Sequence, residues 1–465
     1  MSGGVPVDYY LDLQEDTQSI RGRVHMTWGW TEIDRSIVNG DTFTLYLRNA
    51  IPIHVVCKQL GQELLIVIYD PRTSPFSFKA HPVRQFPELP VPRPLPAIAD
   101  ISAGRVALAT PPMGWNSWNH FAERIDDTTV RSIADALVKT GMRDAGYRYL
   151  VIDEGWAAAR GIDGRLRGNT KFPDMKALAD YVHSRGLLFG IYSSPGPLTC
   201  GAYTASFGHE DDDARAFALW GVDYLKYDWC SAGELYPQSA MRSVYQKMGS
   251  ALQRTGRPIA FAICQYGQEE VARWGAAAGG SLWRISADIQ DTWDSMRLNS
   301  LADEEIPHKE HDSVWNDPDM LEVGNGGMTD AEYRTHMSLW ALLGAPLILG
   351  NDPRDLDDAT RKILLNREVI AIDQDPGQGR GKVLSRKDNI EIWIKPLGDG
   401  SIVIGIVNAD VRRKRVELAW KDVGLVQAPL HLRDLWAHKY LTTHSSGVAA
   451  TLDSHQTLLL RVYPS

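Results

Sequence analysis

Eight short apolar runs alternate with helix-like segments between residue 113 and about residue 380, and this alternation constrains the fold more than any other feature. Each run has the length of a buried strand, and the segments between the runs are long enough for helices. The runs lie near residues 113–118, 148–153, 187–193, 223–228, 258–264, 282–288, 313–319 and 346–350. Eight β/α units in about 270 residues are typical of a closed, parallel (β/α)8 TIM barrel. A doubly wound α/β sheet is the alternative, but eight similar units favour closure.

Two of the intervening segments show helical spacing clearly. Apolar residues recur at helical spacing from Val130 to Val138, after Asp126, a residue type that caps helix N-termini. A second segment, from Met175 to Val182, is followed by Gly186, which favours the end of a helix. Both segments therefore predict helices that link neighbouring strands of the barrel.

The regions on either side of the barrel have the alternating pattern of strands instead. Residues 1–86 include Thr42–Leu47 and Leu64–Tyr69 and predict a small N-terminal β domain. Residues 87–112 are rich in proline and predict a stiff, extended linker. We assign residues 113–382 to the catalytic barrel. Residues 383–465 alternate again, and they predict a C-terminal antiparallel β-sandwich.

Charge and composition narrow the classes of function. The net charge of −9 disfavours nucleic acid and anionic membranes as partners. No stretch has the length and apolar character of a membrane span, and the first residues lack the basic start and apolar stretch of a signal peptide. No His/Asp/Glu cluster has metal-ligand spacing, and the four cysteines fit neither a zinc site nor a dense disulfide framework. We therefore expect neither a metal nor a cofactor.

Carboxylates follow several of the predicted strands, where the active site of a TIM barrel lies. They are Asp153, Glu154, Asp228, Asp288, Asp317, Asp319 and Asp352. Asp228 ends the run Tyr224-Leu-Lys-Tyr-Asp228, and Asp288 ends the run that begins at Trp283. Because paired carboxylates are typical of enzymes that act on sugars, we take these two as candidates for nucleophile and proton donor. Asp317 and Asp352 precede prolines and are more typical of turns.

Two cations accompany the leading acids. Lys226 stands two residues before Asp228, and Arg284 stands four residues before Asp288. The two-residue period of a strand places each cation on the same side as its acid. This placement favours a metal-free site in which cations and sugar hydroxyls offset the acids.

Six motifs in this order resemble glycoside hydrolase family 27, the α-galactosidase-like retaining glycosidases of clan D. They are Met113-Gly-Trp-Asn-Ser-Trp118, Ile152-Asp-Glu-Gly-Trp156, Gly190-Ile-Tyr192, Tyr224-Leu-Lys-Tyr-Asp228, Arg284 through Asp288, and Trp315-Asn-Asp-Pro-Asp-Met320. The resemblance covers residues 110–380, continues more weakly through the C-terminal sandwich, and does not extend to residues 1–100. It implies an enzyme that removes terminal α-D-galactosyl residues from galactosides and related oligo- or polysaccharides.

The resemblance also implies roles for individual residues. Asp228 matches the nucleophile and Asp288 the acid/base. The matches to substrate-binding positions are Trp118, Asp153, Glu154, Tyr192, Cys200, Lys226, Gln265, Arg284, Asp319 and Met320. Cys200 and Cys230 match a pair that is bridged in many members, and a bridge here would favour a periplasmic or secreted protein.

Two departures from the family pattern bear on the sugar. Glu154 is one methylene longer than the usual aspartate at the position that contacts C6 of the sugar. The longer side chain could crowd the hydroxymethyl group and favour β-L-arabinopyranose, so a β-L-arabinopyranosidase is the alternative reading. Gln265 stands where animal members carry Glu or Ser near the C2 substituent.

The resemblance implies double displacement, in which Asp228 attacks the anomeric carbon and Asp288 protonates the leaving oxygen. The two carboxyl groups would then stand about 5–5.5 Å apart. We expect Lys226 to hold Asp228 ionised and negative neighbours to keep Asp288 protonated.

Four other readings stay open. An α-N-acetylgalactosaminidase and an enzyme releasing isomaltose from dextran belong to the same family. A non-catalytic carbohydrate-binding protein on an inactive barrel is a different class, which the presence of both aspartates disfavours. A metal-dependent hydrolase lacks its ligands in this sequence.

Overall fold

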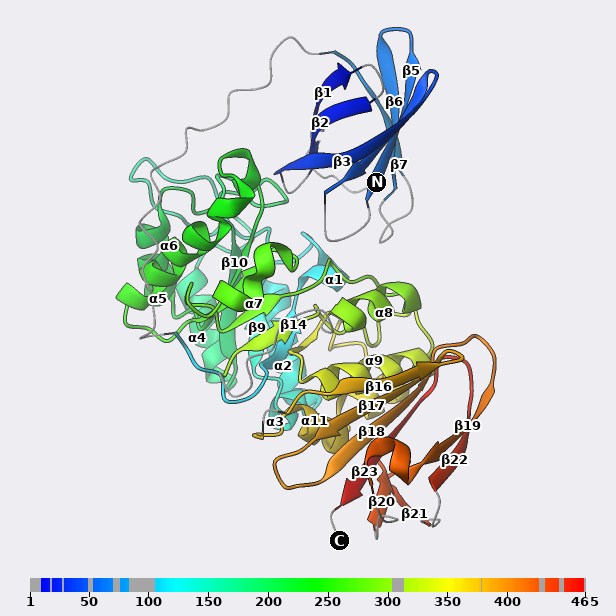
Figure 1. Cartoon of the computed structure of the whole chain (residues 1–465). Coiled ribbons are helices and arrows are strands. Elements are labelled where there is room, and N and C mark those ends of the chain that lie inside the picture. Colours follow the sequence, from blue (N-terminus) through cyan, green and yellow to red (C-terminus); the bar gives the residue numbers. More distant parts are fainter. Residues whose placement is uncertain are drawn as a thin grey trace.

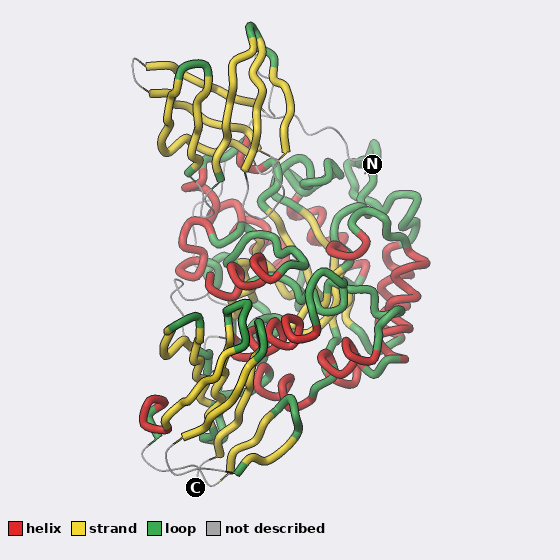
Figure 2. Tube along the Cα trace, turned by 90° about the vertical axis from the view of Figure 1, so that its right-hand side faces the viewer, coloured by secondary structure: helices red, strands yellow, loops and turns green. Residues whose placement is uncertain are grey.

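The computed structural model describes residues 10–16, 19–26, 29–48, 53–69, 76–82, 105–302, 313–377, 379–425, 431–442 and 447–463. Within these residues the chain forms an N-terminal sheet, a central α/β unit and a C-terminal β-sandwich (Figure 1). The N-terminal sheet and the sandwich lie at opposite ends of the molecule in both views (Figures 1 and 2). None of the helices in this described part combines the length and apolar character that crossing a membrane requires.

The N-terminal sheet is antiparallel, and its seven strands pair in the order in which they follow along the chain. They are β1 (Tyr10–Asp16), β2 (Ser19–Met26), β3 (Gly29–Asn39), β4 (Thr42–Leu47), β5 (His54–Leu60), β6 (Glu63–Tyr69) and β7 (Phe76–Ala80). Alternate residues of β4, β5 and β6, such as Leu45, Val55 and Ile66, are buried and form a small apolar core. The linker predicted for residues 87–112 lies outside the described residues up to Gly104.

The central unit is a barrel of eight parallel strands, which confirms the predicted fold class. The strands are β8 (Met113–Asn116), β9 (Tyr149–Val151), β10 (Leu188–Ser193), β11 (Tyr224–Asp228), β12 (Ala260–Cys264), β13 (Leu282–Arg284), β14 (Trp315–Asp317) and β15 (Leu347–Leu349). Neighbours pair in order from β8 to β14, and β15 pairs with β8. A parallel bridge between Leu321 and Leu349 joins the segment after β14 to β15. This bridge closes the barrel and excludes the doubly wound alternative.

Helices and short 3₁₀ turns connect the strands. The helices are α1 (Trp118–Phe121), α2 (Asp127–Lys139), α3 (Met142–Ala145), α4 (Met175–Ser184), α5 (Glu210–Trp220), α6 (Met241–Arg254), α7 (Val271–Trp274), α8 (Trp293–Ala302), α9 (Asp330–Leu343), α10 (Asp358–Leu364) and α11 (Arg367–Asp373). The 3₁₀ turns are η1 (Ala232–Glu234), η2 (Gln238–Ala240), η3 (Gln268–Glu270) and η5 (Trp420–Val423). The two helices predicted from spacing are α2 and α4. Asp126 caps α2 by accepting a hydrogen bond of 2.7 Å from the Thr129 backbone N–H.

The lower part of the barrel interior is apolar. We call this cluster the floor, and its buried members are Val151, Tyr224, Ala260, Ala262, Leu282 and Trp315. Strand β11 contributes to both the apolar floor and the charged end of the barrel. Tyr224, Lys226 and Asp228 are two positions apart along this strand, so they lie on the same side of it. The same strands therefore form an apolar floor and a polar C-terminal end.

The C-terminal sandwich combines a six-stranded antiparallel sheet with a two-stranded one, as the sequence predicted. The larger sheet contains β16 (Lys382–Lys387), β17 (Ile390–Pro396), β18 (Ile402–Asn408), β23 (Thr457–Tyr463), β20 (His431–Asp434) and β21 (Lys439–Leu441). The smaller sheet pairs β19 (Lys414–Ala419) with β22 (Gly447–Leu452).

The barrel and the sandwich share one apolar core, and a buried lysine joins them. Trp393 and Leu459 of the sandwich belong to the same buried cluster as Leu342 of α9. The ammonium group of Lys395, on β17, donates hydrogen bonds to the Ala341 carbonyl at 2.8 Å and the Ile372 carbonyl at 2.9 Å. These carbonyls belong to the last turns of α9 and α11, where backbone oxygens lack partners within the helix.

Candidate active site

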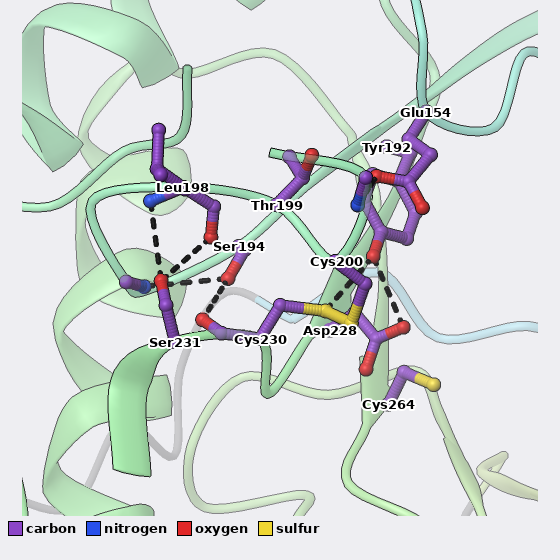
Figure 3. The surroundings of a disulfide bond; sticks show 12 residues. Glu154, Tyr192, Ser194, Leu198, Thr199, Cys200, Asp228, Cys230, Ser231 and Cys264 are labelled. Carbon is purple, nitrogen blue, oxygen red and sulfur yellow. Dashed lines mark hydrogen bonds between the residues drawn. A yellow bond between two sulfur atoms is a disulfide. The ribbon is translucent and has the colours of Figure 1, made fainter. Parts of the chain in front are cut away.

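The carboxylate of Asp228 is buried at the C-terminal end of β11, with 5% of the residue exposed. The Tyr192 hydroxyl, from the neighbouring strand β10, donates a hydrogen bond of 3.1 Å to Oδ2 (Figure 3). The other oxygen, Oδ1, is buried and has no hydrogen-bond partner among the described residues. One oxygen is therefore held by Tyr192, while the other has its hydrogen-bonding capacity unused among the described residues.

The surroundings of Asp228 act on its pKa in opposite directions. Burial is the main reason that this pKa is raised to about 6, and the negative charge of Asp288 acts in the same direction. The Lys226 ammonium and the nearby Tyr266 side chain lower the pKa, without cancelling the effect of burial. The sequence predicted that Lys226 keeps Asp228 ionised. Lys226 does lower the pKa of Asp228, but desolvation by the neighbouring strands raises that pKa by more.

Asp288 occupies a more open position than Asp228, since 62% of its side chain is exposed. Arg284, which is buried at the end of β13, donates from Nη2 to Asp288 Oδ1 at 2.9 Å. The same guanidinium places Nη1 at 3.0 Å from Asp319 Oδ1. We expected negative neighbours around Asp288, and the structure places this cation in direct contact with it.

A second ion pair lies beside Asp228. Lys226 donates to Asp153 Oδ2 at 2.8 Å, and Asn116 donates to the same oxygen at 2.8 Å. The Lys226 ammonium also lies 5.2 Å from the centre of the Tyr192 ring. The C-terminal ends of β9 and β11 thus bring Asp153, Lys226 and Asp228 together.

Glu154 is buried, and its carboxyl group turns toward the loop that carries Cys200 (Figure 3). Oε2 accepts a hydrogen bond of 2.6 Å from the Gly201 backbone N–H. Burial raises the pKa of Glu154 to about 7, although a hydrogen bond from the Thr199 side chain lowers it. The extra methylene lets this side chain reach the loop.

A disulfide between Cys200 and Cys230 links that loop to the segment after Asp228, which confirms the predicted bridge. Cys230 Sγ lies 3.2 Å from the Tyr192 hydroxyl (Figure 3). Ser231, the next residue, accepts from the Leu198 N–H at 3.1 Å and donates to the Leu198 carbonyl at 2.7 Å. The loop beside the proposed nucleophile is therefore tied at two adjacent positions.

Gln265 differs from the sequence-based expectation of a substrate contact. Its side-chain oxygen accepts from the backbone N–H groups of Gly267 at 2.6 Å and Gln268 at 3.1 Å, and its amide donates to the Gln268 carbonyl at 3.1 Å. Both polar ends of this fully buried side chain are therefore engaged by its own loop. Gln265 shapes the loop that presents Tyr266.

The remaining predicted positions lie around the same strand ends. Trp118 is partly exposed at the start of α1, and Met320 is buried after β14. Asp319 adopts a left-handed φ of 84° and accepts from the Ile289 N–H at 2.8 Å. Asp317 accepts from the Asp319 N–H at 2.9 Å, which is the turn contact that its place before Pro318 predicted.

Sequence reasoning missed two contributors to the site, Asn116 and Tyr266. Asn116 lies inside the motif Met113 to Trp118, so its place at the end of the first strand was the available signal. Tyr266 has a left-handed φ of 62° in the loop after β12, and no strand or helix period reports that geometry.

Among the described residues, one cluster has the spacing of a metal site. Its members are Cys200, Asp228 and Cys230, whose potential ligand atoms lie within 4.8 Å of one another. Both sulfur atoms belong to the disulfide, so they are not thiolate ligands in this state.

Comparison with known proteins matches both the barrel and the sandwich to one family. A family model described as "Alpha galactosidase A" matches residues 110–375, and a model described as "Alpha galactosidase C-terminal beta sandwich domain" matches residues 387–462. An alpha-galactosidase from Cyamopsis tetragonoloba is 44% identical over 74% of this chain and 84% of the plant protein. Neither family model reaches the N-terminal sheet.

Two solved structures differ in how much of this chain they cover. A candidate alpha-galactosidase/melibiase from Bacteroides fragilis has a TM-score of 0.73 and 32% identity, and covers 99% of this chain and 92% of its own. A more distant structure is a family 27 β-L-arabinopyranosidase from Geobacillus stearothermophilus, with a TM-score of 0.67 and 25% identity over 77% of this chain and 97% of that one. The first alignment spans the N-terminal sheet, and the second does not cover the whole chain.

Proposed function

Since this chain belongs to the alpha-galactosidase family and is therefore a glycosidase, we propose that it removes terminal α-D-galactosyl residues by double displacement, with Asp228 as nucleophile and Asp288 as acid/base. The observation that carries the proposal is the state of the Asp228 carboxylate. One of its oxygens is fixed by Tyr192, and the other is buried without a hydrogen-bond partner among the described residues. A carboxylate held in this way is suited to form a covalent bond with an anomeric carbon.

The position of Asp288 supports its role as acid/base. An acid that protonates the leaving oxygen and later activates water must be reached by both, and most of the Asp288 side chain is exposed. Arg284 holds one of its oxygens through a hydrogen bond of 2.9 Å. The negative charge of Asp288 also raises the pKa of Asp228, so the two groups influence each other across the site.

The two ion pairs are suited to hold the hydroxyl groups of the sugar. Lys226 with Asp153, and Arg284 with Asp319, offer donors and acceptors side by side at the C-terminal end of the barrel. Such mixed pairs bind hydroxyls because each hydroxyl both donates and accepts a hydrogen bond. Trp118, Tyr192, Cys200 and Met320 are proposed to complete the pocket walls.

Glu154 supports a second candidate function, hydrolysis of β-L-arabinopyranosides. In the structure this carboxyl group contacts Gly201, so it is directed toward the loop that carries the disulfide. A β-L-arabinopyranoside lacks the hydroxymethyl group that this acid would otherwise contact. Rates on the two aryl glycosides separate the candidates. Galactose is the proposed preference because alpha-galactosidases are 42–44% identical to this chain, whereas the β-L-arabinopyranosidase is 25% identical.

The disulfide supports a proposal for the compartment. Disulfides form and persist in oxidising environments such as the periplasm and the extracellular space. We infer that this enzyme works in one of these compartments, on galactosides that include oligosaccharides.

The proposed mechanism is tested by the stereochemistry of the product. Hydrolysis of an aryl α-galactoside is followed by NMR from the first turnovers. Double displacement predicts that α-galactose forms first and then equilibrates to the β anomer. Initial formation of β-galactose would contradict the mechanism. Absence of turnover on every glycoside, together with calorimetric binding of galactose, would favour the non-catalytic alternative.

A further inference from the structure

The N-terminal sheet has no role in the mechanism described above. It lies outside the residues that the family models match, and the barrel supplies both proposed catalytic acids. Strand β3 of the sheet nevertheless lies beside η1, the turn that follows the nucleophile strand β11. The sheet is therefore placed at the end of the barrel where substrate enters.

A direct contact fixes this placement. His25 Nε2, on β2, lies 2.7 Å from Glu234 Oε1, on η1. The side chains are only 12% and 19% exposed, so water screens the contact less than it screens a surface pair. The pair positions one face of the N-terminal sheet relative to the loop after Asp228.

The loop on the barrel side of this contact is stiff. Between Asp228 and Glu234 the chain passes through the disulfide at Cys230 and the two hydrogen bonds of Ser231 with Leu198. A group bound at His25 is thus held at a constant position relative to the pocket, which is what an extended ligand requires if it is to occupy both places at once.

The side chains at the junction have the chemistry of a sugar subsite. Tyr10 and His25 are cross-strand partners, and their rings meet edge to face with centres 5.7 Å apart. Both rings and the Glu234 carboxylate are partly exposed. An aromatic ring offers a surface for the C–H face of a sugar, while the carboxylate accepts hydrogen bonds from its hydroxyls.

We propose that Tyr10, His25 and Glu234 form an outer subsite that binds the sugar units attached to the galactosyl group of an oligosaccharide substrate. This inference rests on the proposed function and adds to it a role for the N-terminal sheet. The outer subsite accelerates hydrolysis of galactosyl oligosaccharides through binding, and it takes no part in bond cleavage.

The test compares two substrates in the full-length enzyme. Raffinose carries two further sugars beyond the galactosyl group, whereas an aryl α-galactoside carries a single ring. Tyr10→Ala is expected to raise KM for raffinose about fivefold and to leave kcat/KM for the aryl galactoside within about twofold, since one ring contact is removed. Tyr10→Phe keeps the ring and should restore the wild-type KM.

Two further variants test the carboxylate of the subsite and control for the loss of a charge within the sheet. Glu234→Gln keeps the size of the side chain and removes its charge, and it should also raise KM for raffinose selectively. Glu63→Gln is the matched control, because it breaks a pair of 3.1 Å with Lys79 within the same sheet, and neither substrate should be affected. Melting temperatures of all variants show whether a change in KM reflects loss of the fold.

The outcomes distinguish the two proposals. If the wild-type enzyme cleaves both substrates and the Tyr10 and Glu234 variants change KM for both equally, or for neither, the outer subsite is wrong and the proposed function stands. If the wild-type enzyme cleaves no galactoside, the proposed function fails, and the outer subsite is overturned with it. A selective rise in KM for raffinose supports both.

Discussion

The two ends of the barrel interior differ sharply although the same strands build both. At the floor, Tyr224 and Leu282 pack in an apolar cluster. At the mouth, only a few residues further along the same strands, Asp228 and Arg284 are buried as charged or titratable groups. Burial stabilises the floor through the hydrophobic effect, whereas at the mouth it carries a desolvation cost that ion pairs offset only in part.

Substitutions at the two ends of the barrel interior should affect different properties of the enzyme. Residues at the floor contribute to stability and have no contact with substrate, and residues at the mouth provide chemistry at the expense of stability. Substitutions at the two ends should therefore separate stability from activity, and the following predictions test that separation in order of decreasing effect.

The largest effect is expected at the nucleophile. Asp228→Asn should lower kcat/KM on an aryl α-galactoside at least about a thousandfold, because the amide cannot form the covalent intermediate. The melting temperature should stay the same or rise, since a neutral side chain is less costly to bury. Asp352→Asn is the control. Its carboxylate also follows a barrel strand but pairs with Arg354 at 2.7 Å, and its activity should stay within about twofold of wild type. Near-normal activity of Asp228→Asn would refute the assignment.

The second effect is expected at the floor. Leu282→Ala should lower the free energy of unfolding by about 2–5 kcal/mol, because it leaves a cavity among fully buried neighbours. Residual kcat/KM of the folded enzyme should stay within about twofold. Leu219→Ala removes an exposed leucine of α5 and should change stability by less than about 0.5 kcal/mol. Equal losses in the two variants, measured by denaturant unfolding, would contradict the comparison.

The third effect concerns the covalent link at the mouth, which the floor lacks. Replacing Cys200 and Cys230 together by serine should lower the free energy of unfolding by about 3.6 kcal/mol, given a sequence separation of 30 residues. Activity should fall as well, because the bridge borders Tyr192 and the nucleophile. A dithiol reductant should lower the free energy of unfolding and the activity of the wild-type enzyme, and it should leave both unchanged in the double variant. If the reductant affects both alike, the bridge is not responsible.

The fourth effect is on the choice of sugar. Glu154→Asp should raise the ratio of kcat/KM for the α-galactoside to that for the β-L-arabinopyranoside about tenfold, because one methylene less leaves room for a hydroxymethyl group. Glu154→Gln keeps the length of the side chain, so it should leave the ratio near the wild-type value. If Glu154→Gln changes the ratio and Glu154→Asp does not, the charge of Glu154 and not its length determines the choice of sugar.

The smallest effect is expected in the pH dependence of stability. Burial raises the pKa of Asp228 from 3.8 to about 6, so between these values the folded state binds more protons than the unfolded state. The free energy of unfolding should therefore decrease as pH rises from about 4 to about 6. Relative to Asp228→Asn, the wild-type melting temperature should fall by about 2–4 °C across this window. Parallel curves for the two proteins would contradict the raised pKa.

Strand positions were predictable from the sequence because hydrophobic runs report burial directly. The period of two along a strand also placed Lys226 on the same side as Asp228. The motifs indicated which strand ends carry acids. These features are local, so a single segment contains the signal.

Other features depended on contacts between segments, which no local pattern reports. The direction of the Glu154 carboxyl group follows from the neighbouring backbone at Gly201. Gln265 folded onto its own loop because Gly267 and Gln268 present their N–H groups there. The raised pKa of Asp228 results from desolvation by adjacent strands, and the docking of His25 on Glu234 joins residues far apart in the chain.

The buried lysine between barrel and sandwich bears on how this enzyme can be cut or recombined. Lys395 supplies donors to the terminal carbonyls of two barrel helices, so a chain shortened to end after α11 would expose both helix ends and a large apolar surface. Engineers who wish to graft this catalytic unit onto another protein should therefore transfer residues through Tyr463 as one piece.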